Sequence, residues 1–110
     1  MTSRDLVMGA WEITEMDVWD KASLDLIEPA HLVFDRDGMG TLGFIAISGG
    51  LDYRVVTRDG QPSVEFSWEG IDEGDQRCGR GWAVVDGDTM TGRFFIHAGD
   101  DSPFRAERRK

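Results

Sequence analysis

The sequence predicts an all-β fold, an eight-stranded antiparallel meander closed into a small barrel. Glycine-bearing turn signals recur roughly every 10 to 14 residues, the rhythm of strands joined by short hairpin turns. Between these turns the segments alternate apolar with polar residues, or are rich in β-branched and aromatic residues. No stretch is long enough to supply a layer of helices, so closure of the sheet buries its apolar face most simply. The alternative is a two-sheet sandwich of the same strands.

The expected strands lie between turn signals at residues 35–38, 48–50, 58–60, 72–75, 85–87 and 98–101. Asp-Gly pairs, which favour the positive φ of tight turns, occur in three of these signals. The eight expected strands are residues 10–16, 30–35, 41–47, 51–57, 63–69, 77–85, 89–97 and 103–109. The segment SVEFSWE (63–69) alternates most strictly, so its apolar residues Val64, Phe66 and Trp68 are expected to face inward.

Residues 17–29 break this pattern, because they lack strict alternation. Asp17 or Asp20 could cap a short helix there. We expect a helical or looped crossover across one barrel end, where it buries Trp19 and Leu26 as a plug. A lid over a binding site is the alternative.

The composition predicts one domain, residues 1–110, with its own hydrophobic core. The net charge of −9 opposes binding to nucleic acid or to an anionic membrane. A single cysteine permits no internal disulfide, and no apolar run reaches the ~20 residues of a membrane span. The first residues show no signal-peptide pattern, so we expect an acidic, soluble, cytoplasmic protein.

Two short motifs near the chain ends resemble those of the calycins, the lipocalin-like barrels that hold small ligands. The first expected strand opens with Gly9, Ala10 and Trp11, and the last expected strand carries Arg105. In calycins a tryptophan at this position closes one barrel end, and a late arginine packs over its ring. The resemblance therefore implies that Arg105 covers Trp11 through a cation–π contact.

A second resemblance covers more of the chain. The stretches EFSWEGIDEGD, GRGWAV and FIHAGDDSPFRAER are similar to an uncharacterised family of small bacterial proteins. This resemblance implies a shared fold, and it implies no activity or cofactor.

The strand that follows the acidic turn at 72–75 decides where a ligand site would lie. If Trp68 faces inward, this strand is expected to direct four side chains inward as well: Cys78, Arg80, Trp82 and Val84. The other face of this strand would then carry almost no side chains, because it consists of Gly79, Gly81 and Ala83. Such a face fits barrel curvature, an aromatic side chain that covers the strand, or a partner chain or ligand that lies against it. The opposite facing is the alternative, because one sequence does not determine the register.

An inward Arg80 needs a countercharge, because an unpaired buried charge is costly. Asp52 or Glu12 could supply that charge, or an anionic ligand in the lumen could. A few polar groups on apolar walls make a typical pocket. The predicted ligand-binding residues are Arg80, Trp82, Trp68 and Tyr53.

No catalytic or metal site is expected. Two histidines and one cysteine are too few for a closed zinc site without carboxylates, and no phosphate-binding glycine loop occurs. Ser102 follows a histidine and two aspartates within one hairpin, where triad geometry is hard to reach, so a turn hydrogen bond is expected instead. Cys78 is expected to be a buried, inert thiol, although the neighbouring Arg77 and Arg80 could make it reactive. We therefore predict no cofactor and no metal.

The expected strand at 41–47 has apolar residues on both faces. A strand of a one-layer barrel normally has one solvated face. Either the 17–29 segment or a second copy of the chain should cover the outer face, and a homodimer through that patch is the leading hypothesis.

Two functions are favoured by the sequence, and an enzyme ranks third because no group of residues is specific enough to define a catalytic mechanism. The first is a non-catalytic barrel that binds a small, partly apolar or anionic molecule in its lumen. The alternative is a protein-interaction module, or a homodimeric structural protein, with a packed barrel and no ligand. The volume left inside the barrel distinguishes these functions.

Overall fold

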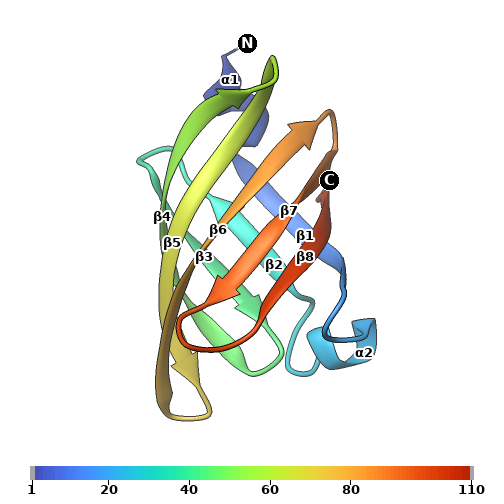
Figure 1. Cartoon of the computed structure of the whole chain (residues 1–110), viewed down its shortest axis with the longest axis vertical. Coiled ribbons are helices and arrows are strands. Elements are labelled where there is room, and N and C mark those ends of the chain that lie inside the picture. Colours follow the sequence, from blue (N-terminus) through green and yellow to red (C-terminus); the bar gives the residue numbers. More distant parts are fainter. Residues whose placement is uncertain (1, 110) are drawn as a thin grey trace.

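The computed structural model describes residues 2–109, and its eight strands form a closed antiparallel meander (Figure 1). Each strand pairs with the next, and β1 also pairs with β8, which excludes a two-sheet sandwich. The strands are β1 (Gly9–Met16), β2 (His31–Phe34), β3 (Met39–Phe44), β4 (Ile47–Arg58), β5 (Gln61–Asp72), β6 (Asp75–Asp86), β7 (Thr89–Ile96) and β8 (Asp101–Arg108). Two short helices, α1 (Ser3–Val7) and α2 (Lys21–Leu24), accompany the barrel.

The turn between β3 and β4 lies at Ile45 and Ala46, not at residues 48–50 as expected. Gly49 instead lies within β4, where a side chain would overlap the carbonyl oxygen of Glu69 on β5. Glycine is needed here for close approach of two strands and not for a turn. The continuous strand at 41–47, with two apolar faces, therefore does not exist, and Ile47 is buried in the core. The basis for a homodimer through that surface is thus removed.

Aromatic side chains fill the inside of the barrel. The buried aromatic residues are Trp11, Phe34, Phe44, Tyr53, Phe66, Trp68, Phe94 and Phe104. Phe94 lies at their centre, with its ring centroid 4.7 Å from that of Phe44 and 5.1 Å from that of Trp68. A side chain at Gly81 would overlap the ring of Phe66, so this inward glycine makes room for a large neighbour. The interior is a packed core.

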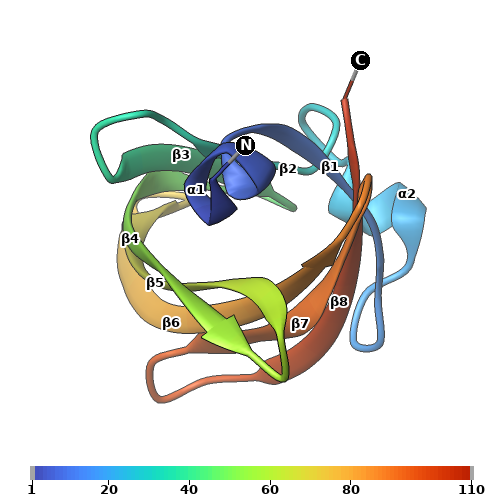
Figure 2. The same ribbon diagram turned by 90° about the horizontal axis from the view of Figure 1, so that it is seen from above.

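The helix α1 lies in the mouth at one end of the barrel (Figure 2). Val7 is fully buried there, and its carbonyl oxygen accepts a 2.9 Å hydrogen bond from the indole N–H of Trp11. The guanidinium of Arg108 lies over the face of the Trp11 ring, 4.3 Å from its centroid. The expectation that Arg105 would do so is wrong, because Arg105 lies opposite Glu15 in the β1–β8 register and is exposed. Trp11 closes this end with Arg108.

The segment between β1 and β2 packs at the opposite end, where α2 lies (Figure 1). Asp20 caps this helix by accepting a 2.8 Å hydrogen bond from the backbone N–H of Ser23, as one of the two expected caps. Trp19 packs edge-on against Phe44, with ring centroids 6.0 Å apart. The buried leucine is Leu24, however, while the expected Leu26 is 62% exposed, because helical structure ends before it.

Lys21 fastens α2 to the outside of β1. Its ammonium group donates to a carboxylate oxygen of Glu12 at 2.9 Å, to the Ile13 carbonyl at 2.8 Å and to Asp25 at 3.0 Å. Partial burial lowers the pKa of Lys21, but its hydrogen bonds to Glu12 and Asp25 outweigh burial and raise the pKa overall. The carboxylate of Asp25 also accepts from the Ala30 N–H at 2.9 Å, and this backbone bond is the main reason for its lowered pKa.

Candidate functional site

The turn between β5 and β6 determines which side chains face outward. Glu73 and Gly74 form a two-residue turn, so Asp72 lies opposite Asp75 and Trp68 lies opposite Gly79. Directly opposed residues in an antiparallel pair share a face of the sheet. The glycines therefore face inward, and the following side chains point outward: Cys78, Arg80, Trp82 and Val84. The expectation that these four side chains face inward is wrong, because the β5–β6 register differs by one residue from the expected one. A shift of one residue moves every side chain of a strand to the opposite face.

The four predicted ligand-binding residues are separated by the sheet. Tyr53 and Trp68 lie inside the barrel, and both use their polar groups within the protein. The Trp68 indole N–H donates to the Phe95 carbonyl at 3.1 Å, and the Tyr53 hydroxyl donates to the Asp35 carbonyl. Arg80 and Trp82 lie on the outer face. The structure therefore does not bring the four together into one pocket.

Arginine and aromatic side chains gather around Trp82 on the outer face of β4–β7. In one row across the sheet, Trp82 lies between Glu65 and Arg93, and in the next row Arg80 lies between Ser67 and Phe95. We name this surface the Trp82 patch, and it consists of Arg54, Arg58, Arg80, Trp82, Arg93 and Phe95. The sequence hinted at this patch only through its arginines and aromatics, because their common face depends on the register.

Arg58 stacks on Trp82, with its guanidinium carbon 4.5 Å from the centroid of the indole ring. An aromatic face attracts a cation in this geometry. The second side of Arg58 faces Glu65, with a nitrogen–oxygen distance of 3.8 Å. Trp82 is held half-buried by these contacts.

The charges of the Trp82 patch are only partly compensated. Arg93 lies 3.6 Å from a carboxylate oxygen of Asp101. Arg54 and Arg80 have no carboxylate oxygen within 4.0 Å among residues 2–109. The two carboxylates expected to neutralise Arg80 are placed elsewhere.

Neither of those carboxylates reaches Arg80. Asp52 shares the outer face but lies two strands away, with Ser67 between them. Glu12 binds Lys21 at 2.9 Å on the other side of the barrel. Arg80 is therefore exposed, and no carboxylate oxygen within residues 2–109 lies within 4.0 Å of its guanidinium nitrogens.

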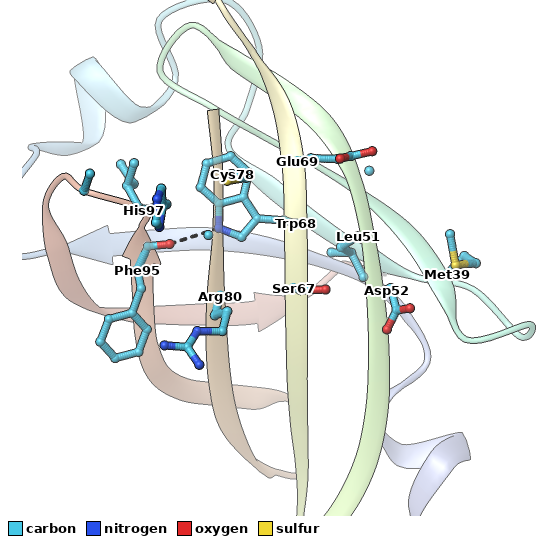
Figure 3. Close-up of a pocket in the computed structure, with 14 residues that line it drawn as sticks. Met39, Leu51, Asp52, Ser67, Trp68, Glu69, Cys78, Arg80, Phe95 and His97 are labelled. Carbon is cyan, nitrogen blue, oxygen red and sulfur yellow. Dashed lines mark hydrogen bonds between the residues drawn. The ribbon is translucent and has the colours of Figure 1, made fainter. Parts of the chain in front are cut away.

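A groove runs along the outer face beside this arginine (Figure 3). One hollow of about 760 Å³ is lined by Asp52, Ser67 and Arg80 together with residues towards Cys78 and His97. A second hollow of about 540 Å³ shares these three residues and extends to Trp82. The two hollows share Asp52, Ser67, Arg80 and Phe95, and both are open to solvent. Figure 3 shows Arg80 and Phe95 on neighbouring strands, with the Arg80 guanidinium pointing towards the Phe95 side chain.

The remaining candidate residues have structural or solvent-exposed positions. Cys78 is exposed on the outer face, so the expectation of a buried thiol is wrong. The Ser102 hydroxyl accepts from the N–H of Asp17 at 3.0 Å and donates to the Pro103 carbonyl at 2.9 Å. It thus anchors the chain that follows β1. In the described part of the chain, no three histidine, cysteine or acidic side chains are grouped to hold a metal ion.

Comparisons with known proteins give no match. No protein-family model matches the chain, and no curated protein or solved structure matches it significantly. The resemblances to calycins and to small bacterial proteins therefore stay predictions. Within residues 2–109, none of the helices has the length and apolar character to cross a membrane.

Proposed function

We propose that this protein is a non-catalytic interaction module that binds an acidic segment of a partner protein at the Trp82 patch. The observation that carries this proposal is the pair Arg54 and Arg80. In a chain of net charge −9, neither arginine has a carboxylate oxygen within 4.0 Å among the described residues, although Arg54 lies opposite Glu65 in the β4–β5 register. Arg80 lies two residues from the outward-facing Trp82 on β6. Arginine and tryptophan are the residue types that contribute most to protein–protein binding.

The packed interior favours this function over ligand binding in the lumen. A ligand inside the barrel would have to displace the aromatic side chains around Phe94, which is 1% exposed. Trp68 would also lose its hydrogen bond to the Phe95 carbonyl. Deleting such contacts costs several kcal/mol per side chain, so a binding surface outside the barrel requires less rearrangement.

The shape of the groove favours an extended protein segment over a small molecule. Sites for small molecules usually enclose most of the ligand surface, whereas this groove is open to solvent along β5 and β6. Carboxylate side chains can form charge-assisted, two-pronged hydrogen bonds with exposed guanidinium groups. A long polyanion such as nucleic acid is disfavoured, because the rest of this acidic chain repels it.

NMR titration with a hexaglutamate peptide tests the proposal, with hexalysine as the control probe. We expect shifts at the backbone amides of Arg54 and Arg80 and at the Trp82 indole N–H. These shifts should weaken at high salt, because exposed charges are screened. Replacing Arg54 and Arg80 by glutamate should abolish the response to hexaglutamate.

The matched control replaces Arg36 and Arg105 by glutamate, which makes the same charge change at two exposed arginines outside the patch. This variant should retain binding at the patch. The proposal is wrong if both double variants lose binding equally, or if hexaglutamate shifts residues elsewhere on the barrel.

A further inference from the structure

The strand β4 extends beyond its neighbour β3 and leaves an open sheet edge. The β3–β4 register ends where Met39 lies opposite Asp52, and the last backbone bond runs from the Tyr53 N–H to the Gly38 carbonyl at 2.8 Å. β4 nevertheless continues to Arg58, paired with β5 throughout. Residues 54–58 therefore have a strand on one side, and no other strand within residues 2–109 pairs with their second side.

The backbone groups that face this edge follow from the alternation of an antiparallel ladder. The Tyr53 N–H points towards β3, so Val55 and Thr57 direct their N–H and C=O groups the same way. Arg54, Val56 and Arg58 direct theirs towards β5. No hydrogen bond to the backbone of Val55 or Thr57 from outside the β4–β5 ladder occurs in the described chain.

This edge lacks two of the features by which proteins usually block an edge strand, although it carries two charged side chains, Arg54 and Arg58. Residues 54–58 contain no proline and no bulge interrupts their pairing with β5. Thr57 and Arg58 are exposed at the rim of the barrel, where the β4–β5 hairpin extends past β3 (Figure 1). The helix α1 packs against the inward side, since Arg4 lies over the ring of the inward-facing Tyr53 at 5.8 Å.

We infer that an extended acidic segment of a partner protein adds to the barrel as a strand beside residues 54–58. The inference rests on the proposed function, because Arg54 and Arg58 of the Trp82 patch are the outward side chains of this edge. An added strand would place an acid, an apolar residue and an acid on the outer face, opposite Arg58, Val56 and Arg54. Backbone hydrogen bonds supply affinity in such strand addition, and the alternating side chains supply specificity.

Charge argues against a second copy of this chain as the added strand. Antiparallel pairing of residues 54–58 with the same segment of a second copy, centred on Val56, would place Arg54 opposite an arginine. Like charges directly opposite each other destabilise a strand pair. An acidic segment in the same position gains charge pairs instead.

The variant Thr57→Pro tests this inference on the edge itself. Proline removes the edge-facing N–H and fills the space of an added strand, while the β4–β5 hydrogen bonds of Val56 and Arg58 are kept. Thr57→Val is the matched control, because it retains the N–H. The probe is acetyl-Glu-Thr-Val-Thr-Glu-amide, measured by fluorescence anisotropy of a labelled form and by NMR.

We expect the parent and Thr57→Val to bind this peptide alike, and Thr57→Pro to bind roughly tenfold more weakly or worse, because backbone hydrogen bonds are lost. The Val55 and Thr57 amides should become protected from hydrogen exchange in the complex. Methylating the backbone nitrogens of the two threonines in the peptide should abolish binding to the unaltered protein, whereas methylating that of its valine should weaken it less. This second arm does not depend on how the proline variant folds.

Strand addition is wrong if the methylated peptide binds as well as the unmodified one. Should the Trp82 patch still shift with the methylated peptide, the proposed function survives and only the strand addition fails. If neither this peptide nor hexaglutamate binds, both fail. A homodimer in native mass spectrometry that Thr57→Pro abolishes would overturn the choice of occupant.

Discussion

The Arg108 guanidinium lies over the Trp11 ring, 4.3 Å from its centroid, and joins the last strand of the barrel to the first. Arg108 also donates to the Met8 carbonyl at 2.8 Å and to the Leu6 carbonyl, so one side chain closes the barrel and holds the end of α1. Asp88 lies 3.3 Å from its Nε. These contacts are concentrated where β1 pairs with β8.

Replacing Arg108 by alanine should therefore destabilise the protein by about 2–4 kcal/mol, through loss of the cation–π contact and of hydrogen bonds to two partly buried carbonyls. Urea unfolding followed by tryptophan fluorescence measures the difference. Arg105→Ala is the matched control on the same strand, and it should change the free energy of unfolding by less than about 0.5 kcal/mol. Equal losses for the two variants would show that Arg108 does not close the barrel.

The inward glycines of β6 give a second prediction. Gly81→Ala should destabilise by about 1–3 kcal/mol, because the added methyl group overlaps the Phe66 ring. Gly50→Ala should be neutral or slightly stabilising, since the nearest atom to its added methyl group is the Gly40 carbonyl oxygen at 3.7 Å. Thermal unfolding of both variants checks the facing of the sheet. A tolerated alanine at position 81 would contradict the inward orientation.

The sequence was sufficient to predict the strand count and the closed meander, because turn glycines and alternation are local signals. It did not reveal the register across β5 and β6, where moving the turn by one residue exchanges Arg80 with Gly81 on the inner face. Glycine also has two meanings in this chain: Gly74 makes a turn with φ 90°, whereas Gly49 permits close strand contact. One sequence does not separate these roles, and the position of the binding surface depends on them.

The decrease in the free energy of unfolding at acidic pH should depend on Asp25. Its pKa is lowered chiefly by the Ala30 N–H and, further, by Lys21, while burial opposes the change. A lowered folded-state pKa contributes stability that is present above the ordinary value of 3.8 and lost as the pH falls through the folded value. Asp25→Asn should therefore be about 1 kcal/mol less stable than the parent at pH 7. This difference in the free energy of unfolding between the parent and the variant should narrow below about pH 4.

Urea titrations between pH 2.5 and 7 measure this difference, with Asp100→Asn, an exposed loop position, as the control. If the difference in the free energy of unfolding stays constant as the pH falls, the charge of Asp25 does not stabilise the fold.

The turn that directs Arg80 outward can be strengthened. Glu73 and Gly74 have φ values of 51° and 90°, and a two-residue hairpin turn with both values positive favours Asn-Gly. Glu73→Asn should stabilise the protein by roughly 0.5–1 kcal/mol, because asparagine tolerates this backbone conformation and one charge is removed between Asp72 and Asp75. Glu73→Val removes the same charge but introduces a β-branched residue that resists positive φ, so it should destabilise. If both variants shift the urea midpoint in the same direction, the charge at position 73, and not the backbone conformation, governs the stability of this turn. That result would contradict the two-residue turn, and with it the outward direction of Arg80.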